Sequence, residues 1–414
     1  MLNRRNSSLY DYVIIGAGIV GLSVARELLA REPNAKIAVV EKENTIGLHA
    51  SGRNSGVLHS GIYYQPDSLK AKVCLEGARL MSSYCEEHGL PLNRIGKVIV
   101  PVRCSDGENL NVLHQRALSN GASIRLINDQ ELKEIEPHAT TATGMALHAP
   151  ETAVVDPMLI MKHLHSSLTK RGVHFFFNSF IDAIDTQGKK ITTSEGNISY
   201  GHLFNTAGLF ADKIAHACGL KSSYRILPFK GYYYELSPDS KLQINHLIYP
   251  VPDMNVPFLG IHFTKSVSGT VYIGPTAIPA LGREHYRGVA GIKLCDFINI
   301  VTSLGRQYYV NRQGFRSYTH QEIPRIFKSR FIKSARALVP GVSKSDLRVS
   351  NKIGIRAQLY DYKHNELITD FLISRTDHVT HVLNAVSPAF TSAFSFAKWI
   401  VNEQKTVCKE PVYR

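Results

Sequence analysis

The sequence of 414 residues lacks the usual marks of a secreted or membrane-spanning protein. Its six cysteines are scattered, and none forms a CxxC pair or a Cys/His cluster at zinc spacing, which predicts free thiols in a reducing compartment and no metal site. No stretch holds the roughly 18 uninterrupted apolar residues that span a bilayer, and the polar opening MLNRRNSSLYDY predicts no secretory signal. We therefore expect a cytoplasmic protein that is soluble or peripheral on the inner face of the cell membrane.

Acidic residues are scarce relative to basic ones. The chain has 48 Lys and Arg against 34 Asp and Glu, a formal net charge of +14. Such an excess favours an anionic partner, and a dianionic substrate, a nucleic acid and a membrane surface all fit. With 44% hydrophobic and 20% charged residues the chain is able to bury a sizeable core, and its length suggests two or three domains of about 150 residues.

What is present begins with a nucleotide-binding pattern near the N-terminus. The apolar run Tyr12–Ile15 predicts a buried parallel strand, Leu22–Arg31 has helical periodicity, and Lys36–Val40 predicts a second strand. GAGIVG stands between the first strand and the helix. The segment is therefore predicted to be one βαβ unit with a glycine-rich turn.

Each glycine of this turn has a separate reason to be glycine. Gly16 permits the tight turn, Gly18 lets the backbone approach a pyrophosphate, and Gly21 lets helix and strand pack closely. Glu41 ends the second strand, at the position where an acidic side chain binds ribose hydroxyls. The predicted dinucleotide-binding residues of this unit are Gly16, Gly18, Ile19, Gly21, Glu41 and Lys42.

A second glycine-rich segment, His49–Tyr64 (HASGRNSGVLHSGIYY), indicates which dinucleotide is bound. Such a stretch can lay backbone N–H groups along an extended ligand, and FAD, whose flavin lies far from its adenine, requires a long cradle. No second GxGxxG appears mid-chain, as it usually does in enzymes that use both FAD and NAD(P)H. We therefore predict FAD as the cofactor, and the predicted ligands in this segment are Ser51, Asn54, Ser55 and Gly56.

Strand-like runs and helical patterns alternate along the rest of the chain, which predicts an α/β fold with an inserted, more antiparallel region. The strand-like runs are Lys97–Val102, His174–Phe177, Leu203–Asn205, Tyr232–Leu236 and Val271–Gly274. The helical patterns are Ser68–Cys85, Pro157–Lys170 and Ala393–Glu403.

Several longer motifs give the chain a resemblance to a known family. They are SGRNSGVLHSGIYYQPDSLKAKVCLEG (51–77), GKVIV (96–100), VVDP (154–157), NTAGLFAD (205–212), IYPVPD (248–253), PFLGIHFT (257–264), GIRAQ (354–358) and NAVSPAFTSA (384–393). With these motifs the chain resembles the D-amino-acid-oxidase-like (DAO) superfamily of flavoproteins and, more narrowly, its L-2-hydroxyglutarate dehydrogenase/oxidase family. The chain departs from the family pattern in two places, and both bear on substrate choice rather than on the cofactor. KGYYYEL (230–236) lacks the acidic residue that usually follows the glycine, and Val386 in NAVSPAFTSA stands where a proline is usual.

The resemblance implies a Rossmann-like FAD-binding domain with an inserted α+β substrate domain built on a largely antiparallel sheet. The implied FAD-binding domain is discontinuous and comprises residues 10–95, 150–225 and 345–414. The implied substrate-binding domain comprises residues 96–149 and 226–344.

The same resemblance implies further FAD contacts outside the βαβ unit. By position, the backbone of Ile181 matches the adenine contact of the family, and Gly208 in NTAG matches a second dinucleotide contact. The segment SPAFTS supplies Pro388, Ala389 and Thr391 and is followed by a helical pattern. We expect the N-terminal amides of that helix to lie against the N1–O2 edge of the flavin, where negative charge develops on reduction.

The implied reaction is oxidation of L-2-hydroxyglutarate to 2-oxoglutarate, with hydride transfer from Cα to flavin N5 and electrons passed to a quinone-type acceptor or to oxygen. A base with a pKa near neutrality suits the hydroxyl proton, and His59 is the first candidate, ahead of His262. Two carboxylates need cationic or hydroxyl ligands, and Arg356 in GIRAQ can bind one of them bidentately. The other candidate substrate ligands are Tyr63, Tyr64, Lys70 and Tyr249.

Alternatives stay open for the function and for one surface. Another DAO-superfamily enzyme would act on glycerol 3-phosphate or an amino acid, and a non-catalytic flavoprotein would associate with RNA. In the stretch between Gly305 and Arg348, aromatic residues interleave with many Lys and Arg. A solvated helix face, docking of a quinone-reducing enzyme on anionic lipid, and a single-stranded nucleic-acid groove all fit this pattern; we expect no nucleic-acid partner.

Overall fold

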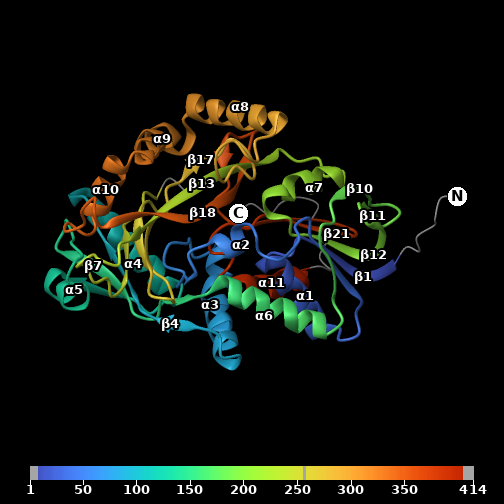
Figure 1. The fold of residues 1–414 in the computed structure, drawn as a ribbon, viewed down its shortest axis with the longest axis horizontal. Helices are drawn as coiled ribbons and strands as arrows, with labels where there is room; N and C mark the ends of the chain where they lie inside the picture. The colour runs from blue at the N-terminus through green and yellow to red at the C-terminus, as the bar shows by residue number, and fades with distance from the viewer. Residues whose placement is uncertain (1–7, 255–257, 404–414) are drawn as a thin grey trace.

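The computed structural model describes residues 8–254 and 258–403 and arranges them around two large β-sheets. Figure 1 shows the first sheet on the right, with β1, β12 and β21, and the second sheet to the left, where β13 and β18 run. The chain crosses from one sheet to the other more than once, so segments that are far apart in the sequence meet at the boundary between the sheets.

The first sheet has eight strands and a parallel centre. β1 lies between β2 and β12, while β9 pairs with β2 and β21 pairs with β12, all in parallel register. The residues of β2 and β21 are buried throughout, as expected for parallel strands covered on both faces. The strands are β1 Ser8–Ile15, β2 Ile37–Val40, β9 His174–Phe176, β10 Ile181–Asp185, β11 Lys190–Thr193, β12 Gly196–Asn205, β20 Leu372–Thr376 and β21 Val379–Asn384.

Helices cover both faces of the first sheet. Residues of α1, α3, α6 and α11 share one hydrophobic core below the sheet in Figure 1, and α7 lies above it. Helix α6 begins at Pro157 because the Asp156 carboxylate accepts hydrogen bonds from the N–H groups of Met158 and Leu159. These helices are α1 Ile19–Arg31, α3 Leu69–Glu87, α6 Pro157–Lys170, α7 Ala211–Ala217 and α11 Ala393–Asn402.

The second sheet has ten strands and is antiparallel except where β14 pairs with β5. Its long strands β13 and β18 pair over most of their length. The strands are β5 Lys97–Val100, β6 Arg125–Asn128, β7 Met145–Ala149, β13 Tyr224–Leu236, β14 Leu247–Pro250, β15 His262–Lys265, β16 Val271–Gly274, β17 Ile278–Pro279, β18 Leu347–Asp361 and β19 Glu366–Leu367.

The remaining elements surround the second sheet and the boundary between the sheets. A small sheet joins β3 Val57–Leu58, β8 Ala153–Val155 and β4 Leu92–Arg94. The other helices are α2 Ala50–Arg53, α4 Gly107–Ser119, α5 Asp129–Ile135, α8 Leu294–Val310, α9 Phe315–Glu322 and α10 Lys328–Arg336, and the short 3-10 helices are η1 Cys104–Asp106, η2 Gly208–Phe210, η3 Arg312–Gly314 and η4 Ile323–Ile326. In Figure 1, α8, α9 and α10 follow the upper left edge of the molecule.

The predicted fold class, an α/β fold with an inserted region on a largely antiparallel sheet, is confirmed. The strand predicted over Lys97–Val102 ends at Val100 instead, because the N–H groups of Val102 and Arg103 donate to the Asp106 carboxylate. The helix predicted from Ser68 begins one residue later, because the Ser68 hydroxyl is its N-cap. The domain boundaries stay a prediction; β18, which follows the boundary predicted at residue 345, is paired within the second sheet.

Candidate active site

A cavity of about 710 Å³ lies at the boundary between the two sheets and is lined by residues of both. The predicted site residues that line it are Gly16, Gly18, Ile19, Glu41, Lys42, Ser51, Asn54, Ser55, His59, Ile181, Gly208, Tyr249, His262, Arg356, Pro388, Ala389 and Thr391. The predicted site residues outside its lining are Gly21, Gly56, Tyr63, Tyr64 and Lys70. A cavity of this size is in the range that binds cofactors.

We call the part around the glycine turn and Glu41 the dinucleotide end. Gly16 has φ +104°, and a Cβ there would lie 2.7 Å from the Thr206 carbonyl oxygen. A Cβ on Gly21 would lie 2.1 Å from the Gly16 carbonyl oxygen, so the turn and α1 pack backbone to backbone. Helix α1 carries no acidic residue in its first turn, which leaves its positive N-terminal end available to a phosphate.

Side chains fix the backbone of the dinucleotide end. The Glu41 carboxylate accepts from the N–H of Ala17 at 2.8 Å and from the N–H of Glu43 at 3.0 Å. Each carboxylate oxygen retains lone-pair capacity for a ribose hydroxyl. The Ser51 hydroxyl accepts from the N–H of Ile19 at 3.0 Å, so the second glycine-rich segment lies directly on the start of α1.

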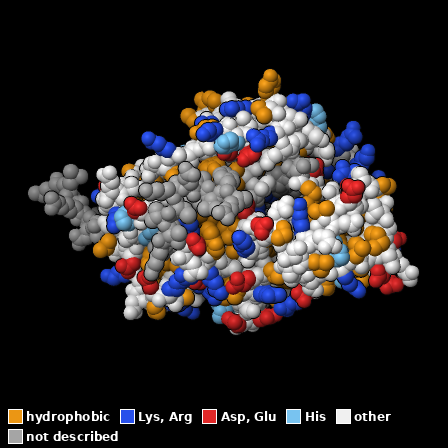
Figure 2. Space-filling view, turned by 180° about the vertical axis from the view of Figure 1, so that it is seen from behind, with side chains coloured by type: hydrophobic (Ala, Val, Ile, Leu, Met, Phe, Trp, Pro, Cys, Tyr) orange, Lys and Arg blue, Asp and Glu red, His pale blue; other side chains and the backbone are white. Residues whose placement is uncertain are grey.

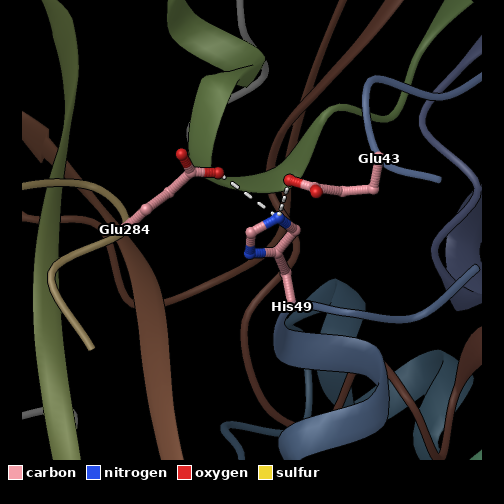
Figure 3. Close-up of side chains that lie close together, drawn as sticks. All are labelled: Glu43, His49 and Glu284. Carbon is pink, nitrogen blue, oxygen red and sulfur yellow. Dashed lines mark hydrogen bonds and ion pairs between the residues drawn. The ribbon is translucent and has the colours of Figure 1, made fainter. Parts of the chain in front are cut away.

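An ion-pair network adjoins Glu41 and joins the N-terminal segment to the loop after β17 (Figure 3). The Lys42 ammonium donates to the carboxylates of Glu43 and Glu284, and His49 Nε2 lies 2.9 Å from Glu43 and 3.3 Å from Glu284. Although burial opposes it, hydrogen bonding to Glu284 and Glu43 raises the pKa of Lys42. Lys42 thus supplies one positive charge to the two carboxylates of this network.

We call the part around His59, Tyr249, His262 and Arg356 the substrate end. The Tyr249 and His262 rings stack with centroids 3.9 Å apart, on neighbouring strands β14 and β15. His59 Nε2 lies 3.3 Å from the Ser387 hydroxyl, and the N–H of His59 donates to Thr391 Oγ1 at 3.1 Å. The substrate end is therefore assembled from the second glycine-rich segment, the antiparallel sheet and the SPAFTS segment.

Both histidines of the substrate end are neutral at physiological pH. Burial, assisted by the charges of Lys97 and His262, lowers the pKa of His59 to about 3. Burial lowers the pKa of His262 to about 4, although a hydrogen bond to the Gly260 carbonyl opposes the shift. That carbonyl, 2.8 Å from His262 Nδ1, can only accept, so Nδ1 carries the proton and Nε2 has the free lone pair.

Arg356 brings an unpaired positive charge to the substrate end. Its Nε donates to the Gln358 side-chain oxygen at 3.1 Å, and its guanidinium lies 5.1 Å from the centroid of the Phe258 ring. Burial lowers its pKa to about 10, so the group remains charged at neutral pH. Among residues 8–254 and 258–403, no carboxylate forms an ion pair with it.

Three predicted substrate ligands lie behind the cavity wall. The Lys70 ammonium donates to the Thr369 carbonyl and lies 5.8 Å from the centroid of the Tyr64 ring. The Tyr63 ring lies 4.9 Å from the ammonium of Lys97.

Lys97 and Glu284 were not singled out from the sequence; a charged residue opening the apolar run KVIV is the signal that could have identified Lys97.

The residues present fit FAD. The glycine turn admits close approach of a pyrophosphate where any Cβ at Gly16 would meet backbone, and Glu41 lies beside it. Ser51, Asn54, Pro388 and Ala389 line the same cavity, so the βαβ unit, the second glycine-rich segment and the SPAFTS segment all border one space.

Comparison with known proteins agrees with this geometry. The family model described as FAD dependent oxidoreductase (DAO) matches residues 11–403. The chain is 38% identical to a protein named L-2-hydroxyglutarate dehydrogenase from Indibacter alkaliphilus, over 93% of this chain and 96% of the relative. It is 34% identical to a protein of the same name from Escherichia coli K12, over 96% of this chain and 94% of the relative.

Among solved structures, the fold is similar to a reduced L-α-glycerophosphate oxidase from Mycoplasma pneumoniae with FAD bound. The TM-score is 0.76 with 21% sequence identity, and the match covers 98% of this chain and 97% of the other. At that identity the likeness concerns the fold alone.

Proposed function

The chain belongs to the family of FAD-dependent oxidoreductases, and on that premise we propose that it oxidises L-2-hydroxyglutarate to 2-oxoglutarate. FAD is its cofactor. One observation carries the proposal. The substrate end brings together a guanidinium without an acidic partner among the described residues, that of Arg356, and two neutral histidines, His59 and His262. The names of the relatives at 34–38% identity supply the substrate.

FAD, when bound, supplies the hydride acceptor. The chain's own residues then have two tasks, to hold the substrate and to accept its hydroxyl proton. Arg356 binds one carboxylate of the substrate with the fixed fork of its guanidinium. The stacked rings of Tyr249 and His262 and the buried walls around them keep water from the reacting carbon.

His262 is the base that the hydrogen bonds favour, and His59 is the alternative that the sequence favours. His262 Nε2 has its lone pair because Nδ1 donates to Gly260, whereas His59 Nε2 is shared with the Ser387 hydroxyl. We expect His262→Asn to lower kcat by about 10²–10⁴-fold with flavin retained, the range for loss of a general base. An equal loss in His59→Asn with little change in His262→Asn would transfer the role to His59.

The reaction is tested by anaerobic bleaching of the bound flavin. The holoenzyme is mixed, without oxygen, with L-2-hydroxyglutarate, with D-2-hydroxyglutarate, with glycerol 3-phosphate and with amino acids, and absorbance near 450 nm is followed. We expect rapid bleaching with the L-enantiomer alone. Bleaching by glycerol 3-phosphate or an amino acid instead would assign the chain to another substrate of the superfamily.

For the electron acceptor we propose a quinone reached at an anionic membrane surface. No helix within the described ranges has the length and apolar character needed to cross a bilayer, so contact would be made from one side. The outer face of α8 exposes Leu294, Ile298, Val301 and Tyr309. At the top of Figure 2, where α8 lies in Figure 1, hydrophobic side chains project beside Lys and Arg.

This surface, which we call the α8 face, combines insertion of apolar side chains with attraction of anionic lipid. Each basic residue near an anionic surface contributes about 1 kcal/mol at low salt. We expect the protein to sediment with phosphatidylserine-containing vesicles at low salt and Ile298→Asp to abolish this. The control is Leu118→Asp, which changes an exposed apolar residue on α4. If wild type stays in the supernatant at every salt concentration, the membrane proposal is wrong.

A further inference from the structure

Lys97 is a charged residue in the middle of an apolar layer. It opens β5 and lies opposite Leu247 of β14 and Ala149 of β7, with 0% of its surface exposed. Because side chains alternate along a strand, Lys97 shares a face with Ile99, which belongs to a hydrophobic cluster that includes Tyr249. A lysine is almost never fully buried unless it is paired.

The Lys97 ammonium has no pairing partner in the part of the chain that the structure describes. Its Nζ makes no hydrogen bond there, and no carboxylate forms an ion pair with it. Its near neighbours are two aromatic rings, with centroids 4.9 Å away for Tyr63 and 5.4 Å away for Tyr249. Cation–π contact offsets only part of the lost hydration of a buried charge.

The position of this charge relates it to the cavity. Tyr249 lines the substrate end and stacks on His262, which also lines it. Lys97 is thus in contact with the ring of Tyr249, which lines the cavity, and is not part of the lining itself. Arg356, the cation that lines the substrate end, is likewise without an acidic partner among the described residues. Two positive charges therefore act on one end of the cavity, and neither forms an ion pair with a carboxylate among the described residues.

We propose that Lys97 is a specificity-determining residue: with Arg356, its unpaired ammonium makes the substrate end select dianionic 2-hydroxy acids over monoanionic ones. The proposal rests on the proposed function, and adds to it how the second carboxylate is recognised. Arg356 would bind one carboxylate by direct contact. Lys97 would act on the other through the field that it sets up behind Tyr249, because interactions in a buried space are weakly screened.

A packing role for Lys97 predicts a different result. If the stem of Lys97 only filled space between the two tyrosines, replacing it by methionine would disturb the packing and lower Tm. If its charge is unpaired and retained for ligand recognition, the same substitution leaves Tm unchanged or raises it, because replacing a buried charge with an apolar group of similar volume is often neutral or stabilising.

The charge of Lys97 can also be removed by raising the pH. Burial lowers the pKa of Lys97 to about 8, although the Cys74 thiol opposes the shift. The other titratable groups around it ionise elsewhere: burial raises the pKa of Cys74 to about 12 and the pKa values of Tyr63 and Tyr249 further. Burial lowers those of His59 and His262 to about 3 and 4. The preference for a dianion should therefore fade above pH 8.

The test measures binding rather than turnover. Dissociation constants of 2-oxoglutarate, a dianion, and 2-oxopentanoate, a monoanion, are determined by calorimetry on flavin-loaded protein at pH 7 and pH 9. At pH 7 we expect Lys97→Met to weaken the binding of 2-oxoglutarate about tenfold and that of 2-oxopentanoate less than twofold. Lys97→Arg should bind both ligands about as tightly as wild type does. Lys328→Met, which removes a charge beside the Tyr234 ring, is the matched control and should change neither constant.

The outcomes separate this inference from the proposed function. Equal weakening of both ligands in Lys97→Met, no weakening of either, or a fall in Tm would overturn the role of Lys97 while leaving the oxidation reaction standing. Wild type that binds 2-oxoglutarate selectively through Lys97 but is not bleached by L-2-hydroxyglutarate would overturn the reaction alone. Wild type that binds neither ligand would overturn both.

Discussion

The two ends of the cavity differ in whether their charged side chains have partners. At the dinucleotide end, Glu41 is held by two backbone N–H groups, and Lys42 is paired with Glu43 and Glu284. At the substrate end, Arg356 and Lys97 have no acidic partner among the described residues, and His59 Nδ1 has no hydrogen-bond partner there either. At one end the charged side chains have partners, whereas at the other the two cations gain an acidic partner only when an anion enters.

This difference matches what each end has to bind. A cofactor that stays bound is served by a rigid backbone cradle whose own charges are satisfied, since nothing there has to respond to turnover. A substrate that enters and leaves is recognised by charges that its arrival compensates, and the protein accepts lower stability at that end in return. The predictions below test the contrast, beginning with the largest expected effect.

The cradle should fail when its backbone contact is blocked. In Gly16→Ala the new methyl would meet the Thr206 carbonyl oxygen at 2.7 Å, at a φ of +104° that L-residues rarely adopt. We expect at least a hundredfold weaker FAD binding, seen as purified protein without the 450 nm band. Gly18→Ala, whose methyl meets only the Ser51 hydroxyl at 3.0 Å, should be milder, and Gly305→Ala, which has open space, should stay yellow. A fully yellow Gly16→Ala would contradict the fit to FAD.

The substrate end should lose activity without losing flavin. Arg356→Met removes the cation that binds a carboxylate, and truncating one partner of a buried charged contact typically costs about 2–5 kcal/mol. We expect kcat/KM to fall by about a hundredfold or more. Arg356→Lys, which keeps the charge but not the guanidinium fork, should recover part of it. Loss of the 450 nm band in both variants would move Arg356 from substrate binding to cofactor binding.

Acid should destabilise the protein through its buried neutral histidines. Burial lowers the pKa values of His59, His202, His262 and His381 to about 3 or 4, below the ordinary value of 6.5. Between those values the unfolded chain binds more protons than the folded one, so stability is fully present above pH 6.5 and falls as the pH drops toward 4.

The measurement is Tm in matched-ionic-strength buffers. We expect a decrease of several degrees between pH 6.5 and pH 4.5, with flavin release accompanying unfolding. A Tm that is flat over this interval would show that these histidines are not held neutral, and the argument for a histidine base at the substrate end would lose its support.

The same contrast explains what the sequence could predict. The dinucleotide end is local: strand, glycine turn, helix and Glu41 follow one another within about 30 residues, so spacing alone identifies them. The substrate end joins His59, Tyr249, His262 and Arg356 through strand pairings that no local pattern specifies. Each of these residues lies in a recognisable motif. That they belong to one site was implied by the resemblance to a family and not by their spacing in the sequence.

Two particulars lay beyond the sequence for physical reasons. The sequence shows Lys97 as a charge that opens an apolar run, but its complete burial follows only from its pairing between β14 and β7. Tyr63, Tyr64 and Lys70 lie in the motif that also carries His59, yet the chain turns so that they stand behind the cavity wall. Which side of a wall a side chain occupies depends on tertiary packing.

The smallest effect is expected at the dinucleotide end, where the charged side chains already have partners. Glu284→Gln removes one carboxylate from the network in Figure 3, but Lys42 keeps Glu43, and the Glu284 side chain is 28% exposed, so solvent screens what is lost. We expect the Kd of FAD to change by less than about threefold, and a double-mutant cycle with Lys42→Met to give a coupling below about 1 kcal/mol. If the affinity for FAD fell tenfold or more, the loop after β17 would hold the cofactor in place through the Lys42–Glu284 pair. Binding at the dinucleotide end would then depend on a single charged contact, as we expect at the substrate end.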